Sequence, residues 1–217
     1  MKPKDLKYPF KWESRLPLLK EGIFYVPKFY KDHSANLFPS WQVVFGNHFP
    51  VNIEYCSGNG EWIINKAQEH PGENWVAVEH NFERVRKIFS KRNNLALKNL
   101  FIISGDAFTF TQEYIKQGSI ASAFVNFPDP WPKKRHAKHR LIQLPFIQEI
   151  KRVFHAKGTL TLVTDSDAYS EQMKEVIILS QMFKPSKYNE GHYGSSYFSR
   201  LWTGLGRSIH FLHYQST

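Results

Sequence analysis

Apolar residues along this chain fall into short continuous runs and into longer stretches with a spacing of three to four positions. From residue 51 onward the two patterns take turns. Strands are predicted over residues 51–55, 75–78, 100–104, 122–127 and 158–164, and helices over 61–69, 82–96, 141–154 and 168–183. Strands that alternate with helices at this spacing favour a parallel sheet covered on both faces. The pattern therefore predicts a doubly wound α/β fold.

The two ends of the chain depart from this alternation. The aromatic and β-branched runs 197–202 and 208–214, separated by Gly204-Leu-Gly206, predict two closing strands. The first fifty residues are rich in proline and aromatic residues and show no clear period. We expect an N-terminal arm over residues 1–45, either ordered over an active site or partly disordered, followed by one domain over residues 46–217.

The composition indicates a soluble protein. With 217 residues, of which 41% are hydrophobic, the chain can bury the core of one α/β domain. No stretch approaches the ~18 apolar residues of a membrane span, and the Lys-rich start lacks the apolar core of a signal peptide. The single cysteine, Cys56, cannot form an internal disulfide. These features predict a cytoplasmic protein.

The net charge of +10 is concentrated in two segments. Residues 1–31 hold eight Lys or Arg against three acids, and residues 133–140 hold five Lys or Arg and no acid. A basic excess confined to particular segments indicates a surface that binds a polyanion such as RNA. The alternative is that both segments are solvated basic loops.

A carboxylate adjoins the second basic segment. Asp129 lies between Pro128 and Pro130, whose rings restrict the backbone and disfavour helix. We therefore expect residues 127–132 to form a stiff extended loop that presents Asp129 and Trp131. Such a loop suits a planar, electron-rich substrate held beside a polyanion.

Three further acids follow the predicted strands: Glu54, Glu79 and Asp106. Ligands of open α/β sheets bind at the carboxyl ends of the strands, and Gly58 and Gly60 permit a close approach of the backbone. An NAD-dependent oxidoreductase would favour a third glycine for the pyrophosphate, but the turn continues with the acid Glu61. The pattern favours a ligand without a phosphate.

The segment Pro128-Asp-Pro-Trp-Pro-Lys-Lys-Arg-His136, with Lys138, Arg140 and Leu141 after it, closely resembles the signature of the bacterial tRNA (guanine-N7)-methyltransferases. The resemblance implies a Rossmann-like class I methyltransferase fold, with a seven-stranded, mostly parallel sheet and a C-terminal antiparallel hairpin. It also implies methyl transfer from S-adenosyl-L-methionine to N7 of a variable-loop guanosine of tRNA, at position 46, with S-adenosyl-L-homocysteine as the product.

The resemblance extends to individual residues. The implied cofactor-binding residues are Glu54, Gly58, Gly60, Glu79, Asp106 and Asp129. Glu79 would accept hydrogen bonds from the ribose diol, Asp106 would reach the adenine amino group, and Glu54 would lie near the amino-acid end or the sulfonium. The implied tRNA-contacting residues are Lys133, Arg135, His136, Lys138, His139, Arg140, Asp165, Ser196 and Ser199.

Asp129 is the expected catalytic residue. Guanine N7 carries a lone pair and no proton, so the transfer needs alignment and a negative environment rather than a general base. The Asp129 carboxylate could accept hydrogen bonds from the guanine N1 and amino hydrogens. Trp131 would either stack on a base or be an ordinary half-buried tryptophan.

Two segments differ from the family pattern. Glu54-Tyr-Cys-Ser-Gly-Asn-Gly60 has Cys56 where the first glycine is usual, which predicts a modest shift of the methionine end of the cofactor. Ser196-Tyr-Phe-Ser199 stands where Thr-x-Tyr-Glu is usual, so a hydroxyl persists and the glutamate is lost. Structural alternatives also exist on the substrate side: Lys133 could pair with Asp129, and Asp165 could cap the next helix.

Two other functions are consistent with the fold. Asn126-Phe-Pro-Asp129 resembles the loops of methyltransferases that act on exocyclic amines of bases, although the Pro-Pro pair is absent. A non-catalytic RNA-binding protein would keep the fold, but the three strand-end acids argue against it. No histidine spacing indicates a metal site, so no metal is predicted. A monomer is the favoured oligomeric state.

Overall fold

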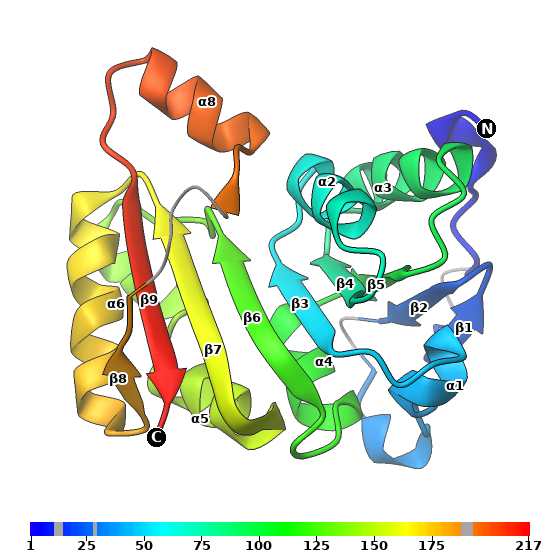
Figure 1. Cartoon of the computed structure of the whole chain (residues 1–217), viewed down its shortest axis with the longest axis horizontal. Coiled ribbons are helices and arrows are strands. Elements are labelled where there is room, and N and C mark those ends of the chain that lie inside the picture. Colours follow the sequence, from blue (N-terminus) through cyan, green and yellow to red (C-terminus); the bar gives the residue numbers. More distant parts are fainter. Residues whose placement is uncertain (11–14, 28–29, 188–192) are drawn as a thin grey trace. The chain divides into compact units, whose positions relative to one another are not determined.

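The computed structural model describes residues 1–10, 15–27, 30–187 and 193–217. The chain divides into two units, Met1–Lys116 and Gln117–Thr217 (Figure 1). The expected boundary after residue 45 stays a prediction, and residues 11–14 and 28–29 of the expected arm lie outside the described residues.

The first unit contains a sheet with the strand order β1-β2-β5-β4-β3. Its strands are β1 (Leu18–Lys20), β2 (Ile23–Val26), β3 (Val51–Tyr55), β4 (Asn74–Glu79) and β5 (Leu100–Gly105). β2, β5, β4 and β3 are parallel to their neighbours, whereas β1 is antiparallel to β2. All residues of β2, β3 and β4 are buried, as expected for parallel strands covered on both faces.

Helices cover this sheet. They are the 3-10 helices η1 (Pro3–Asp5) and η2 (His33–Ala35) and the α-helices α1 (Trp41–Phe45), α2 (Glu61–Glu69), α3 (Phe82–Asn94) and α4 (Ala107–Tyr114). α2 and α3 pack on each other and on β4, and α3 also packs on β5.

The N-terminal residues belong to this unit. Arg92 of α3 is buried and donates to the carbonyl oxygens of Gly22 at 2.7 Å and Glu21 at 2.9 Å. Ser90 Oγ donates to the carbonyl oxygen of Met1 at 2.7 Å. The described part of the expected arm thus contributes two strands, β1 and β2, and packs against α3.

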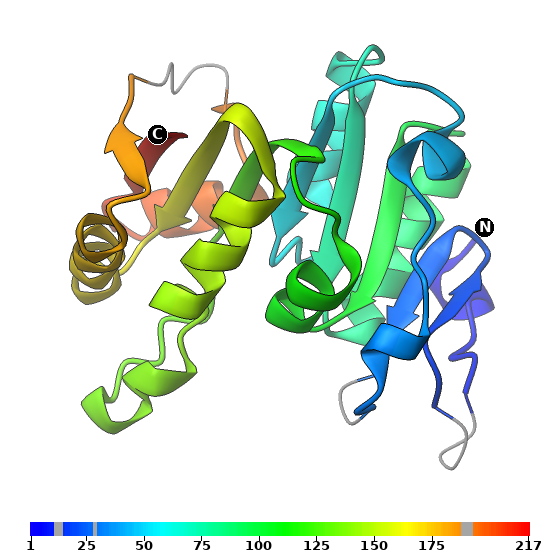
Figure 2. The ribbon, with the colours of Figure 1, turned by 90° about the horizontal axis from the view of Figure 1, so that it is seen from below.

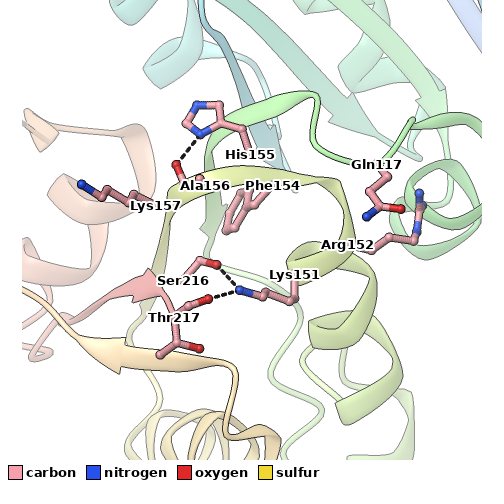
Figure 3. Close-up of a pocket in the computed structure, with 9 residues that line it drawn as sticks. All are labelled: Gln117, Lys151, Arg152, Phe154, His155, Ala156, Lys157, Ser216 and Thr217. Atoms are coloured by element: carbon pink, nitrogen blue, oxygen red, sulfur yellow. Dashed lines mark hydrogen bonds between the residues drawn. The ribbon is translucent and has the colours of Figure 1, made fainter.

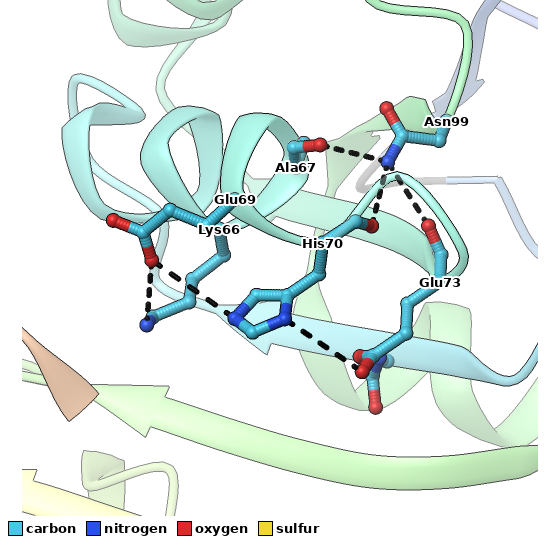
Figure 4. Close-up of polar contacts among 7 residues, drawn as sticks. Lys66, Ala67, Glu69, His70, Glu73 and Asn99 are labelled. Carbon is cyan, nitrogen blue, oxygen red and sulfur yellow. Dashed lines mark hydrogen bonds and ion pairs between the residues drawn. The ribbon is translucent and has the colours of Figure 1, made fainter. Parts of the chain in front are cut away.

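A polar network fixes the connection between α2 and β4 (Figure 4). Asn99 Nδ2 donates to the carbonyl oxygens of Ala67, His70 and Glu73 at 2.9, 3.2 and 3.0 Å. Glu69 accepts from Lys66 Nζ at 3.0 Å, and the His70 ring lies 4.0 Å from the carboxylates of both Glu69 and Glu73. Carbonyls at the end of a helix lack helical partners, so Asn99 ends α2 and holds the chain where β4 begins.

The second unit has the strand order β6-β7-β9-β8. Its strands are β6 (Ile120–Asn126), β7 (Phe154–Thr164), β8 (Phe183–Pro185) and β9 (His210–Ser216). β6 and β7 are parallel, and β9 is antiparallel to both β7 and β8.

The described helices of the second unit include η3 (Lys134–His139), α5 (Leu144–Val153), α6 (Asp167–Ser180) and α8 (Tyr197–Gly204). α5 and α6 pack together, and α6 also contacts β7, β8 and β9. Figure 2 shows η3 projecting beyond the end of α5, away from the strands of its unit.

The α/β class is confirmed, but the C-terminal prediction is wrong in one element. Residues 197–202, predicted as a strand, form the helix α8, and the strand that pairs antiparallel with β9 on that side is β8. Ser196 caps α8, and Phe198 stacks on Trp202 with 6.4 Å between ring centroids. This i to i+4 pair reveals a helical period that aromatic content had obscured. The described residues contain nine strands rather than seven, because β1 and β2 come from the N-terminal segment.

A cavity of about 500 Å³ opens at the amino end of β7 (Figure 3). Lys151 Nζ donates to Ser216 Oγ at 2.6 Å and to the backbone oxygen of Thr217. Arg152 pairs with Glu149 at 2.6 Å. Two of the basic groups that line the cavity are thus engaged within the fold, and the lining residues include none of the predicted site residues.

The half-buried His213 of β9 makes stability depend on pH. Its Nδ1 shares a hydrogen bond with Thr161 Oγ1 at 2.8 Å, and burial lowers its pKa below the ordinary 6.5. As pH falls, His213 therefore binds a proton in the unfolded chain before it does so in the folded chain. The buried neutral ring contributes its full share of stability above pH 6.5, and this share is lost as pH falls from 6.5 toward the lowered pKa of the folded state.

We expect His213→Gln to flatten the dependence of the free energy of unfolding on pH below 6.5, because glutamine keeps a polar partner for Thr161 without titrating. Urea unfolding between pH 5 and pH 8 measures this. His155→Gln, which removes an exposed histidine of the same unit, is the control. Equal curves for His213→Gln and the wild type would contradict the assignment.

Candidate functional site

Three predicted acids gather at one edge of the first unit. β3, β4 and β5 are parallel and in register, so their carboxyl ends share that edge. Glu54 is the penultimate residue of β3, Glu79 is the last of β4, and Asp106 follows β5. Glu54 and Glu79 are each 2% exposed, whereas Asp106 is exposed. The edge therefore carries two buried carboxylates and one that faces solvent.

The turn after β3 requires unusual backbone conformations. Cys56, Gly58 and Gly60 all have positive φ, at 61°, 56° and 72°. The turn is closed by hydrogen bonds from Ser57 N to the carbonyl oxygen of Val78 at 3.1 Å and from Gly60 N to that of Ser57 at 2.8 Å. It thus bridges β3 and β4 and leads directly into α2.

Cys56 occupies a position suited to glycine. A non-glycine residue in the left-handed region costs about 1–2 kcal/mol, which accounts for the glycine usual at this point of the family motif. The cysteine keeps the conformation that glycine would adopt, with φ 61°. The predicted shift of the methionine end of the cofactor stays a prediction.

Gly60 is restricted by its neighbour as well as by its backbone. A Cβ at this position would lie 2.6 Å from Ile88 Cγ1, whereas a Cβ at Gly46, which has a similar φ of 69°, would meet nothing within 4 Å. We expect Gly46→Ala to lower the free energy of unfolding by about 1 kcal/mol and Gly60→Ala by about 2–4 kcal/mol, since only the second adds a core clash.

Chemical denaturation of the two variants measures the difference. Gly60 belongs to the turn that is predicted to approach the cofactor, and it directly precedes α2, which begins at Glu61. Displacement of Ile88 and Gly60 should therefore also weaken binding of S-adenosyl-L-homocysteine, in the Gly60 variant alone. Equal destabilisation of both variants would show that the backbone conformation, rather than packing on Ile88, accounts for the effect.

Glu79 organises the turn through both carboxylate oxygens. Oε2 accepts from Gly58 N at 2.8 Å, and Oε1 accepts from Asn81 N at 2.7 Å. His80 Nδ1 lies 3.6 Å and the Arg84 guanidinium Nη1 lies 3.9 Å from this carboxylate. Each oxygen of a carboxylate has two lone pairs, so Glu79 can hold the turn and still accept hydrogen bonds from a diol.

Asn81 is a contributor that the sequence prediction missed. Its side chain caps α3 by accepting from Glu83 N at 3.0 Å, while its own N–H holds Glu79. The usable signal was an asparagine directly before an amphipathic helix. Asp106 plays a matching part at α4, where Oδ1 accepts from Thr109 N at 2.8 Å. N-caps at the starts of α3 and α4 thus hold the segments that carry Glu79 and Asp106 in place.

In the second unit, Asp129 follows the carboxyl end of β6. Phe127 N donates to the carbonyl oxygen of Val163 at 2.9 Å, and Asp129 itself is exposed. The predicted extended loop is corrected at two positions, because Phe127 and Trp131 have positive φ values of 48° and 41°. Each such residue costs about 1–2 kcal/mol, so the loop stores strain.

The basic segment after the loop is mostly exposed. Lys133, Arg135, Lys138 and His139 face solvent, and His136 is half-buried. The Trp131 ring is 38% exposed and lies 5.8 Å from the His136 ring and 5.2 Å from the His139 ring, measured between centroids. Among the residues that the structure describes, Lys133 does not form the ion pair with Asp129 that was considered as its structural alternative. The segment thus offers cations and an aromatic face together.

Arg140 differs from its neighbours. It is only 9% exposed, and its Nε donates to the carbonyl oxygen of Pro130 at 2.7 Å. Its position inside the fold was not evident from a run of basic residues, because charge patterns do not distinguish an outward guanidinium from an inward one.

Asp165 follows the carboxyl end of β7 and pairs with Arg207. The Arg207 guanidinium also lies over the Trp202 ring, 4.1 Å from its centroid. The N-cap of α6 is Ser166, which accepts from Tyr169 N, so Asp165 does not cap the helix. Its ion pair instead ties the end of β7 to the segment after α8.

Ser196 and Ser199 are brought together at the start of α8. Ser196 Oγ accepts from Ser199 N at 3.0 Å, and Ser199 Oγ accepts from Ser196 N at 2.8 Å. This reciprocal pair forms a capping box, in which Ser199 takes the part usually played by a glutamate or glutamine. Their expected contact with tRNA stays a prediction.

Within the described ranges, no group of three or more His, Cys, Asp or Glu side chains could hold a metal ion. No helix in the same ranges is long and apolar enough to span a bilayer.

Comparisons with known proteins agree with this arrangement. A family model described as a putative methyltransferase matches residues 48–209. The chain is 45% identical over 212 residues to a tRNA (guanine-N(7)-)-methyltransferase of Chlamydia felis, with 96% of this chain and 95% of that protein covered. A protein of the same name from Geobacter metallireducens is 33% identical, with 82% and 87% covered.

Solved structures support the fold. A 30S ribosomal A1408 methyltransferase from an uncultured bacterium superposes with a TM-score of 0.57 at 13% identity, covering 81% of this chain and 91% of that one. A SAM-dependent methyltransferase from Aquifex aeolicus gives 0.53 at 11% identity, covering 77% and 82%.

The family model and these relatives show a methyltransferase that depends on S-adenosyl-L-methionine, and the solved structures agree with a class I, Rossmann-like fold. More narrowly, the chain belongs to the tRNA (guanine-N(7)-)-methyltransferase family.

Proposed function

We propose that this protein transfers a methyl group from S-adenosyl-L-methionine to N7 of the guanosine at position 46 in the variable loop of tRNA. The observation that carries the proposal is the 45% identity over 96% of the chain to a relative named for this activity. The Asp129 loop and the basic segment after it supply chemistry suited to a guanine and to RNA phosphates.

The first unit would bind the methyl donor. When bound, S-adenosyl-L-methionine supplies an electrophilic methyl group attached to a sulfonium. The residues fit this group, because Glu79 retains acceptor capacity for ribose hydroxyls after bonding Gly58 N and Asn81 N. Asp106, which caps α4 and is exposed, would accept a hydrogen bond from the adenine amino group. Glu54 would lie near the amino-acid end of the cofactor or its sulfonium. Gly58 and Gly60 would let the turn approach the ligand.

The second unit would bind the guanosine and the surrounding RNA. Asp129 would accept hydrogen bonds from guanine N1 and its amino group, which orients the ring and offsets the positive charge that develops on the purine. No base is needed, because N7 has no proton to lose. Arg135, His136, Lys138 and His139 would contact phosphates, and Lys133 and Asp165 would contact the nucleoside.

Incubation of the purified protein with methyl-labelled S-adenosyl-L-methionine and unmodified tRNA, followed by nucleoside analysis, tests the proposal. We expect labelled 7-methylguanosine and a loss of labelling when the variable-loop guanosine is replaced by adenosine. Labelled N6-methyladenosine would indicate an amino methyltransferase instead. An absence of label in any nucleoside would favour a protein that only binds RNA.

We also propose that the protein acts as a monomer in the cytoplasm, where it would meet tRNA. Its two basic segments suit a protein that meets tRNA. Light scattering of the protein alone and with tRNA measures the stoichiometry, and a stable dimer would contradict the monomer.

A further inference from the structure

Arg140 lies at the end of the basic segment, but its guanidinium is turned into the second unit. Nε donates to the carbonyl oxygen of Pro130 at 2.7 Å, and Nη2 lies 3.5 Å from that of Trp131. Nη1 donates to Gln172 Oε1, and the guanidinium lies over the Tyr169 ring, 4.9 Å from its centroid. Its donors are thus used on the backbone of the Asp129 loop and on α6.

α6 also fixes the chain beyond Arg140. The fully buried Ile142 donates its N–H to Tyr169 Oη at 3.0 Å and accepts from Gln172 Nε2 at 3.2 Å through its carbonyl oxygen. Tyr169 and Gln172 therefore hold both Arg140 and Ile142. A side chain anchored in this way can restrain the loop that it touches.

The loop needs such a restraint. Trp131 has a φ of 41°, a conformation that a bulky side chain keeps only when the surrounding structure imposes it. Pro128 and Pro130 fix their own φ angles, and the start of the loop is anchored by Phe127 N on Val163. The hydrogen bond to the Pro130 carbonyl is the corresponding anchor at the far end.

We propose that Arg140 is a positioning residue for methyl transfer and not a contact to tRNA phosphate. By holding the carbonyl oxygens of Pro130 and Trp131, it keeps Trp131 in the left-handed conformation and fixes the Asp129 carboxylate between two anchored ends. This inference rests on the proposed function, because it assigns a role in the same reaction. The exposed Arg135 and Lys138 remain the phosphate contacts.

Arg140→Lys separates the two roles. Lysine keeps the positive charge but lacks the planar fork that reaches two carbonyls and Gln172 together. We expect kcat to fall about 10²-fold, the loss typical of a reacting group misplaced by about 1 Å, with the Kd for tRNA within about twofold of the wild type and an unchanged salt dependence. A phosphate contact would instead leave kcat nearly intact in the lysine variant.

Two further variants complete the test. Gln172→Ala removes one partner of Arg140 from α6 and should lower kcat about three- to tenfold, less than additively with Arg140→Ala, because the two residues form one unit. Lys138→Ala, the exposed comparison, should weaken tRNA binding and reduce the slope of log K against log salt by about 0.7. Thermal unfolding of each variant checks that the fold persists.

The outcomes distinguish this inference from the proposed function. If the wild type forms no 7-methylguanosine, the proposed function fails. If the wild type is active but Arg140→Lys retains its kcat, or if Arg140→Ala lowers the salt slope as Lys138→Ala does, the positioning role is overturned and the function stands. Additive effects of Arg140→Ala and Gln172→Ala on kcat would also overturn it.

Discussion

Replacement of Asp129 by asparagine should lower kcat for methyl transfer to tRNA by about 10²–10³-fold, the range found when a group that stabilises developing charge is removed. Asparagine has nearly the same shape, so the loop between Pro128 and Pro130 should persist. It lacks the negative charge, however, and one of its two acceptor oxygens becomes a donor. The N1 and amino hydrogens of guanine would then face an amide that can accept from only one of them.

The affinity for S-adenosyl-L-homocysteine separates this role from a general loss of structure. We expect its Kd to stay within about twofold of the wild-type value, since an effect on kcat alone marks an interaction made in the transition state. Calorimetry with the product and single-turnover kinetics with tRNA give the two numbers. Asp32→Asn, at an aspartate whose side chain accepts from Ser34 Oγ in η2 of the first unit, is the matched control. Undiminished turnover in Asp129→Asn would remove the carboxylate from the mechanism.

Much of the first unit could be predicted from sequence because its determinants are local. Short, largely apolar runs at residues 51–55, 75–78 and 100–104 marked β3, β4 and β5, and an acid within or shortly after each run marked a shared edge. The positions of Glu54, Glu79 and Asp106 follow from the parallel register alone. What could not be predicted was that Ile23–Val26 would join β5, since that pairing links residues about eighty positions apart.

The second unit shows where local patterns fail. Tyr197–Trp202 contains enough aromatic residues for a strand, but the serine pair at its start provides a capping box that favours a helix. Proline content predicted a stiff loop around Asp129, whereas the left-handed conformation of Trp131 depends on a guanidinium nine residues later. Such a contact leaves no periodic trace in the sequence, so Arg140 was indistinguishable from the cations beside it.

Replacement of Glu79 by glutamine should have the largest effect in the first unit. We expect the Kd for S-adenosyl-L-methionine to rise about 100-fold and the free energy of unfolding to fall by about 1–3 kcal/mol, because charge-assisted hydrogen bonds are lost and a buried donor is left unpaired. Gly58 N and Asn81 N donate to different oxygens of the carboxylate. A glutamine side chain presents one oxygen and one NH₂ group, so one of these N–H groups would face another donor.

The two expected effects of Glu79→Gln have different readouts and a common control. Calorimetric titration gives the Kd for S-adenosyl-L-methionine, and urea unfolding without ligand gives the free energy of unfolding. Glu69→Gln changes a glutamate of the same unit whose side chain is 57% exposed and pairs with Lys66, and it should leave the Kd unaltered. A stability loss in Glu79→Gln without any change in Kd would mean that the carboxylate supports the Gly58 turn but does not touch the ribose. A loss of affinity with unchanged stability would mean that the carboxylate touches the ribose but does not support the Gly58 turn. Only the two losses together match a carboxylate that bonds the turn and the cofactor at once.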